Sequence, residues 1–300
     1  MSMSVRKWTK TIRAGVKRGQ RRALKPVTSQ QAALIQMQQV QLRLQYQQML
    51  AADGDLPGYQ DVGFRVFSDV DEDGILLYLL TLAGTDSKRL VDIGAAGVAA
   101  SNSANLIVNQ GWSGLLIDAD SESVAAAGAD YQSLGVMPPD MVNAWVTAEN
   151  VNQLITEHGS NGAIDLLSID IDGNDYWVWK AIETITPRIV VIEYQDILGP
   201  ERSVTIPYDP DFSKSDYTEN ATDNNYVGAS LRAMVKLGTA KGYRLVAINA
   251  YGFNAFFVRE DVACDTLPQI PVEAGFRHPW NEYGMRERWP LVSHLPWVEV

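Results

Sequence analysis

The sequence predicts an α/β fold built on a mostly parallel sheet. Between residues 88 and 194, short apolar segments of strand length alternate with segments of helix length. Alternation at this spacing is typical of parallel strands joined by right-handed crossover helices. The chain has 300 residues, of which 46% are hydrophobic, so it can bury the core that such a sheet requires.

Five strands and four helices are expected in order along this part of the chain. The strands are expected at residues 89–92, 114–118, 142–147, 163–170 and 188–195. The helices are expected at residues 101–112, 121–135, 149–159 and 175–185. Polar or glycine residues separate the members of each pair, as turns between strands and helices require.

Charge divides the chain into a basic arm and an acidic body. Residues 1–52 contain ten Lys or Arg and no Asp or Glu, although the whole chain has a net charge of −11. The rest carries 15 basic and 36 acidic residues, a balance of −21. We therefore expect an arm at 1–52, an α/β domain at 53–262 and a C-terminal extension at 263–300.

The second half of the arm predicts a glutamine-rich helix over residues 29–50. Its apolar side chains approximate one helical stripe, formed by Leu34, Met37, Leu44 and either Val40 or Gln41. Because Gln dominates the polar face, docking on the body or homo-oligomerisation is favoured over direct lipid contact.

The first half of the arm is basic, and residues 5–25 are expected to bind an anionic membrane surface or another polyanion. Sequence-specific reading of nucleic acid is not expected, because the protein is acidic and lacks a recognisable reading motif.

The single cysteine, Cys264, suits a reducing compartment. Neither a secretory signal nor an apolar run of roughly 20 residues is present. A cytoplasmic location, peripheral to the inner face of a membrane, is therefore expected.

Acidic residues stand at the ends of several predicted strands. They are Asp92, Asp118, Asp170, Asp172 and Glu193. In open α/β sheets, ligands bind beyond the carboxyl ends of the strands. One such acid alone can cap a helix or close a turn, but the shared placement of all five predicts a site along this edge.

A glycine turn follows the first predicted strand, at Gly94-Ala95-Ala96-Gly97. Such a turn lets a cofactor approach the backbone, and an acid closing the second strand can bind ribose hydroxyls. Dinucleotide and S-adenosylmethionine sites both use this geometry. The GxGxxG pattern is absent, which disfavours an NAD-dependent enzyme.

The stretches "VDIGAAG", "LLIDAD", "SIDIDGND" and "RIVVIEY", in this order, resemble class I S-adenosylmethionine-dependent methyltransferases. The closest resemblance is to the FkbM-like branch, whose fourth strand ends in (K/S)-I-D-(V/I)-(E/D)-G-x-(E/D). Asp170, Asp172, Gly173 and Asp175 match that pattern. The resemblance covers about residues 60–262. It implies a Rossmann-like sheet that closes, over residues 228–261, with a helix, a strand and an antiparallel final strand.

The resemblance also implies which residues hold S-adenosylmethionine. The methionine end is assigned to Asp92, Gly94 and Gly97, with Ala95 and Asn102 beside them. The ribose is assigned to Asp118, and the adenine to the neighbourhood of Thr147 to Glu149. The chain departs from the family at Ala96 and Val98, where further small glycines are common. Val98 is expected to crowd the approach of the cofactor to the backbone.

The acids after the fourth and fifth strands are candidates for the chemistry. One of Asp170, Asp172 and Glu193 can remove a hydroxyl proton while the others hold the substrate or a Mg²⁺ ion. The alternative is a metal-free cluster bonded to backbone amides and to Lys or Arg. His278, in an aromatic and basic stretch, is a further catalytic candidate, against the simpler reading of a structural histidine.

A long polar connection at 195–227 interrupts the alternation and predicts a lid or substrate loop. It holds seven acids and two bases, which disfavours a phosphate-rich acceptor and suits sugar hydroxyls. The sequence therefore predicts an S-adenosylmethionine-dependent O-methyltransferase acting on a sugar, glycan or related polyhydroxylated acceptor. The alternative is a non-catalytic assembly or glycan-binding protein that retains the fold.

Overall fold

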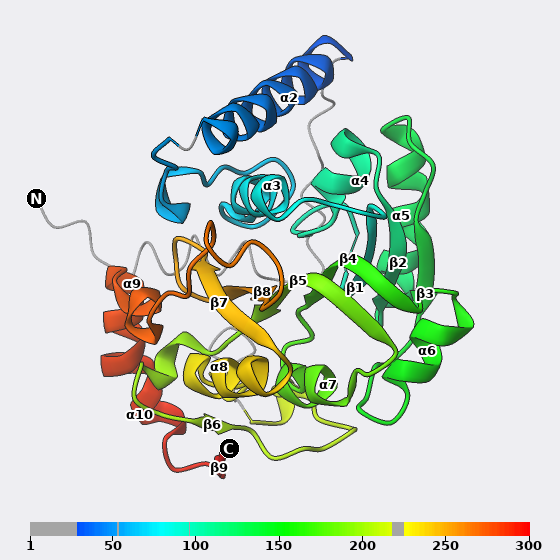
Figure 1. The fold of residues 1–300 in the computed structure, drawn as a ribbon. Coiled ribbons are helices and arrows are strands. Elements are labelled where there is room, and N and C mark those ends of the chain that lie inside the picture. The colour runs from blue at the N-terminus through cyan, green and yellow to red at the C-terminus, as the bar shows by residue number, and fades with distance from the viewer. Residues whose placement is uncertain (1–28, 53, 96, 218–224) are drawn as a thin grey trace, which may run out of the picture.

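A computed structural model of the chain describes residues 29–52, 54–95, 97–217 and 225–300. Its centre is a seven-stranded sheet in the order β3-β2-β1-β4-β5-β8-β7 (Figure 1). The strands are β1 (Arg89–Ile93), β2 (Ser113–Asp118), β3 (Asp140–Asn143), β4 (Gly162–Ile169), β5 (Ile185–Glu193), β7 (Tyr243–Ile248) and β8 (Asn254–Arg259). β8 is antiparallel to both of its neighbours, and β1 to β5 pair in parallel. The predicted sheet with an antiparallel final strand is confirmed.

Helices cover both faces of the sheet. One face packs against α3 (Glu72–Ala83), α4 (Ala104–Gln110) and α5 (Ser121–Ser133). The other packs against α6 (Val151–Glu157), α7 (Asp175–Ala181) and α8 (Leu231–Ala240). Because both faces are covered, the central strands contain apolar runs with no polar alternation, as "IVVI" in β5 illustrates.

The glutamine-rich segment forms α2 (Ser29–Ala51), which lies outside α3 and also contacts α4 (Figure 1). The ring of Tyr46 is buried edge-on against Tyr78, with 5.0 Å between the ring centres. Buried Gln39 exchanges hydrogen bonds with Asn105 of α4. The helix is therefore docked on the body. Residues 5–25 lie outside the described residues. Among the described helices, none combines the length and apolar character that crossing a bilayer requires.

Two predicted ends were wrong by four residues. The third strand ends at Asn143 and does not continue to 147, because the Trp145 indole turns outward to donate to the Pro210 carbonyl at 2.7 Å. The fourth helix ends at Ala181, four residues early. There the side chain of Asn152 donates to the Ala181 carbonyl and accepts the Glu183 N–H, so a partner outside the helix satisfies its end.

The C-terminal residues cover the 195–227 connection. They form η4 (Val272–Phe276), α9 (Pro279–Tyr283), η5 (Gly284–Arg288), α10 (Trp289–Val292) and β9 (Val298–Glu299). β9 pairs in antiparallel fashion with β6 (Val204–Thr205) of the connection, whose other elements are η2 (Asp196–Leu198) and η3 (Lys214–Tyr217). A separate short helix, η1 (Tyr59–Asp61), precedes α3. The extension and the connection share one apolar cluster that includes Phe212, Tyr226 and Val292.

Candidate active site at the carboxyl edge of the sheet

The turn after β1 lies directly against the turn after β4. Gly94 has a φ of 91°, and a Cβ at this position would lie 1.7 Å from the carbonyl oxygen of Asp170. The Gly94 N–H also donates to the Ile117 carbonyl of β2 at 2.8 Å. Only glycine tolerates both this backbone conformation and this approach. Gly94 therefore brings the predicted cofactor turn and the predicted acid site together.

Asp92 lies beneath the start of α4. Its Oδ2 accepts a hydrogen bond from Ser103 Oγ at 2.6 Å, and burial raises the pKa of the Asp92 carboxyl to about 6. Asn102 donates to Ser168 Oγ of β4 at 3.3 Å. The side chain of Val98 is 2% exposed and belongs to the apolar cluster around α3 and α4. The predicted crowding by Val98 was therefore wrong, because its side chain is part of the core. Ala96 lies outside the described residues.

Asp118 ends β2 as predicted, and its Oδ1 accepts the Asp120 N–H at 2.8 Å. Thr147 and Glu149 lie in the loop between β3 and α6. The hydroxyl of Tyr208, from the 195–227 connection, bonds to the Glu149 carboxylate and accepts the Ala148 N–H. This bond lowers the pKa of exposed Glu149. The connection therefore reaches the loop that was predicted to lie near adenine.

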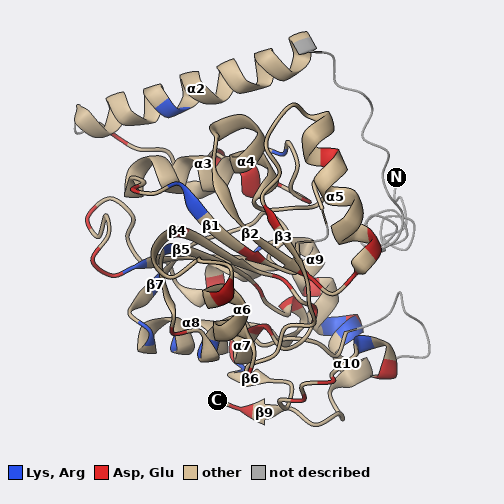
Figure 2. Cartoon of the chain, turned by 90° about the vertical axis from the view of Figure 1, so that its right-hand side faces the viewer, with Lys and Arg blue, Asp and Glu red and all other residues tan. Residues whose placement is uncertain are grey.

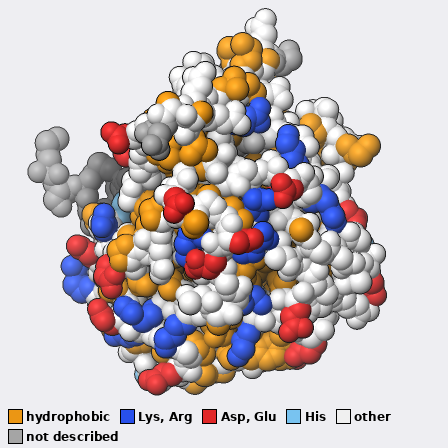
Figure 3. Space-filling view, in the orientation of Figure 1, with side chains coloured by type: hydrophobic (Ala, Val, Ile, Leu, Met, Phe, Trp, Pro, Cys, Tyr) orange, Lys and Arg blue, Asp and Glu red, His pale blue; other side chains and the backbone are white. Residues whose placement is uncertain are grey.

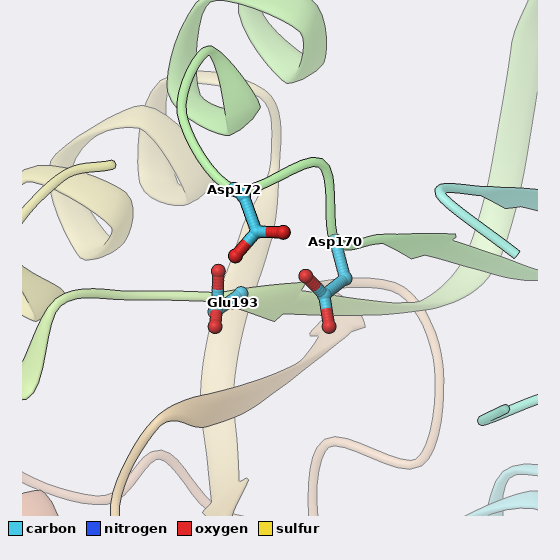
Figure 4. A group of neighbouring side chains, drawn as sticks. All are labelled: Asp170, Asp172 and Glu193. Atoms are coloured by element: carbon cyan, nitrogen blue, oxygen red, sulfur yellow. The ribbon is translucent and has the colours of Figure 1, made fainter. Parts of the chain in front are cut away.

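Three of the predicted acids converge at one place. Asp170 directly follows β4, Asp172 lies two residues further in the turn, and Glu193 is the last residue of β5. One carboxylate oxygen of each lies within 4.8 Å of the others, and Figure 4 shows the three side chains pointing toward one another. Burial, followed by the negative charges of Asp170 and Asp172, raises the pKa of Glu193 well above its usual value.

The fourth acid of the motif has a different position. The Asp175 carboxylate accepts the backbone N–H groups of Ile171 at 2.8 Å and Gly173 at 2.9 Å. It thereby closes the turn in which Asp172 adopts a left-handed φ of 57°. Asp175 holds the turn, and the turn aims Asp170 and Asp172 at Glu193.

The 195–227 connection is fixed on top of this turn. Lys214 Nζ lies 2.7 Å from Asp172 Oδ1. The Phe212 ring occupies the space next to Gly173, where a Cβ would lie 2.5 Å from the ring. Asn174 also donates to the Asp209 carbonyl at 2.7 Å. Sequence reasoning missed Lys214, although it is one of only two bases among the seven acids of the connection.

His278 lies at the start of α9. Its Nδ1 accepts the Trp280 N–H at 3.1 Å, and its ring centre is 4.6 Å from that of Tyr251. Partial burial lowers the pKa of the imidazole. These contacts are those of a helix cap, and a catalytic role for His278 stays a prediction.

No protein-family model and no curated protein matches this sequence. Solved structures with a similar fold include an O-methyltransferase from Bacillus cereus in complex with SAH (14% identity, TM-score 0.40, 74% of this chain and 88% of that chain). A putative O-methyltransferase from Klebsiella pneumoniae is 15% identical, with a TM-score of 0.39 over 73% of this chain and 99% of that chain. A S-adenosylmethionine-dependent methyltransferase from Clostridium acetobutylicum is 13% identical, with a TM-score of 0.38 over 73% and 98%. At such low identities and scores, the site assignments rest on the residues of this chain.

Proposed function

We propose that this protein transfers a methyl group from S-adenosylmethionine to a hydroxyl of a sugar, glycan or related polyhydroxylated acceptor. The observation that carries the proposal is the convergence of Asp170, Asp172 and Glu193 against the Gly94 turn. Proton acceptors are thereby combined with a glycine turn and with an acid at the end of β2, Asp118. This combination suits an adenosyl cofactor and a hydroxyl nucleophile.

The residues around the glycine turn fit the cofactor. At Gly97, with a φ of 120°, a Cβ would meet only the Ala127 methyl at 3.9 Å, so the backbone there has open space beside it. Asp92, Gly94, Ala95, Gly97 and Asn102 would hold the methionine end. Asp118 would bind the ribose, and the loop from Thr147 to Glu149 would border the adenine. When bound, S-adenosylmethionine supplies the methyl group to be transferred.

The acid cluster would prepare the acceptor hydroxyl. The raised pKa of Glu193 makes its carboxylate a stronger proton acceptor than an ordinary glutamate, so Glu193 would accept the hydroxyl proton. Asp170 and Asp172 would accept hydrogen bonds from neighbouring hydroxyls and thus orient the acceptor. The polar connection above the cluster, including Tyr208, offers further partners for a sugar and few for a phosphate.

The alternative of a non-catalytic assembly or glycan-binding protein rested on the altered cofactor loop, Ala96 and Val98. Val98 lies in the core, which removes its part of that reasoning.

We also propose a cytoplasmic location at the inner face of a membrane, with residues 5–25 bound to anionic lipid or another polyanion. Salt-sensitive co-sedimentation of the full chain with anionic vesicles is expected, and its absence at low salt would contradict this role.

Asp118→Ala is expected to weaken S-adenosylmethionine binding by about 1.5 to 3 kcal/mol, because a charge-assisted hydrogen bond to the ribose is lost. Isothermal titration calorimetry with the cofactor alone measures this change without an acceptor. Asp130→Ala, which removes an exposed carboxylate from α5, is the control and should bind normally. Unchanged affinity in a folded Asp118→Ala variant would remove the ribose assignment.

The charge of the acid cluster can be balanced in two ways. A Mg²⁺ ion would take one oxygen from each of Asp170, Asp172 and Glu193 and keep its remaining ligands as water. Lys214 already supplies an ammonium group to Asp172. A metal at this place would compete with that ammonium group for the negative charge of Asp172. We propose that Lys214 serves as the cation of the cluster and that turnover persists in EDTA.

Lys214→Met is expected to bind Mg²⁺ about tenfold more tightly than the unaltered protein. The reason is that the metal no longer competes with a neighbouring cation for Asp172, a difference of roughly 1.4 kcal/mol in binding free energy. Calorimetry with magnesium chloride alone measures the affinity, and Lys214→Arg, which keeps the charge, should resemble the unaltered protein. A loss of turnover in EDTA that magnesium restores would instead assign the cluster to the metal.

A further inference from the structure

The helix α2 has a second apolar face that no described residue covers. Its exposed apolar side chains include Leu34, Met37 and Leu44, which are 57%, 66% and 50% exposed. Figure 3 shows orange side chains over α2 at the top of the molecule. This outer face follows alternating steps of three and four residues, through Leu34, Met37, Gln41, Leu44 and Gln48. Such spacing is that of the a and d positions of a coiled-coil seam.

The opposite face of the same helix is the one docked on the body. Gln39 and Tyr46 are buried against α4 and α3. Arg43, the single charged residue of α2, lines a cavity of about 350 Å³ together with Lys88 and residues at the end of α4. The outer face therefore carries no charge. Figure 2 shows α2 with one blue band and no red along its length.

A helix at the surface of a protein normally has one apolar stripe toward the core and charged residues opposite. α2 instead has apolar stripes on two opposite sides. This pattern is typical of a helix that lies between two layers. Only the inner layer is supplied by the described residues, which are α3 and α4.

We propose that the outer face of α2 pairs with the same face of a second copy of this chain. The face offers no carboxylate to the basic residues 5–25 and no cation to an anionic lipid, so neither is its natural occupant. An uncharged face can pair with itself without bringing like charges together. α2 stands at the periphery of the body (Figure 1), so pairing through it keeps the two acidic bodies, each with a balance of −21 after residue 52, away from one another. This pairing does not depend on methyl transfer.

Light scattering coupled to size-exclusion chromatography tests the pairing with the full chain. The unaltered protein is expected to elute as a dimer at micromolar concentration. The triple variant Leu34→Lys, Met37→Lys, Leu44→Lys places like charges across the seam and should raise the dissociation constant more than about 100-fold. The matched control is Met137→Lys with Leu291→Lys, which makes the same change at exposed apolar positions off α2 and should remain dimeric.

A disulfide trap tests the seam itself. In a Cys264→Ser background, Gln41→Cys at the centre of the seam should form a covalent dimer on mild oxidation. Met137→Cys, at an exposed position off α2, should not. A monomeric unaltered protein at the highest soluble concentration would overturn the proposal. So would a dimer that survives the triple lysine change, because its interface would then lie elsewhere. Binding of the monomer to uncharged vesicles through this face would assign it to lipid instead.

Discussion

Asp172→Asn is expected to lower the rate of methyl transfer by about 10²-fold or more while leaving cofactor affinity nearly unchanged. The substitution removes one of the three converging carboxylates and the partner of Lys214. It preserves the turn, because Asn tolerates the left-handed conformation that Asp172 adopts, with its φ of 57°. Asp170→Asn and Glu193→Gln are expected to behave alike, since each removes a carboxylate from the same cluster.

The rate can be followed as release of S-adenosylhomocysteine in the presence of a panel of sugars. Asp216→Asn is the matched control, because it removes an exposed charge from the same connection without touching the cluster. Its rate should equal that of the unaltered protein. Normal turnover by both Asp170→Asn and Asp172→Asn would return these acids to turn and scaffold roles.

Gly94→Ala is expected to lower the free energy of unfolding by about 3 to 5 kcal/mol and to abolish cofactor binding in any protein that still folds. Its Cβ would lie 1.7 Å from the carbonyl oxygen of Asp170, and neither backbone can yield without separating β1 from β4. The strain of a φ of 91° adds to this overlap.

Chemical denaturation measures the stability, and calorimetry measures the cofactor affinity. Gly111→Ala separates the two causes, because Gly111 also has a positive φ, of 69°, in the left-handed helical region, but nothing lies within 4 Å of its Cβ position. Gly111→Ala should lower the free energy of unfolding by only about 1 kcal/mol. Equal losses at both positions would contradict the close approach of the two turns.

The central fold was predictable because its signals are local. The apolar runs of β1, β2, β4 and β5 and the polar turns between them are each contained within a few residues. The carboxyl ends of parallel strands meet at one edge, so the convergence of Asp170, Asp172 and Glu193 follows from their place at strand ends. The sequence does not distinguish the structural role of Asp175 from the role of these three acids in the site. The partners of Asp175 are backbone N–H groups of its own turn, which the sequence pattern does not reveal.

The upper wall of the site was not predictable, because it is built by contacts between distant segments. Lys214 reaches Asp172 only because Phe212 packs beside Gly173 and the Trp177 indole donates to Ile206. The third strand was misplaced for the same reason, since the Pro210 carbonyl holds Trp145 outside the sheet. No periodicity in the sequence encodes these pairings.

The pairing of β9 with β6 has a consequence for the order in which the site is made during synthesis. The Val300 N–H donates to the Ser203 carbonyl at 3.0 Å, and Ser203 Oγ donates to the Val300 carbonyl at 2.7 Å across a sequence separation of 97 residues. The base of the connection that carries Lys214 therefore acquires its partner strand only after residue 300 has left the ribosome. The cofactor turn and the three acids belong to earlier, more local structure. The parallel strands of the nascent chain can therefore form before the base of the wall above the acid cluster has its partner strand.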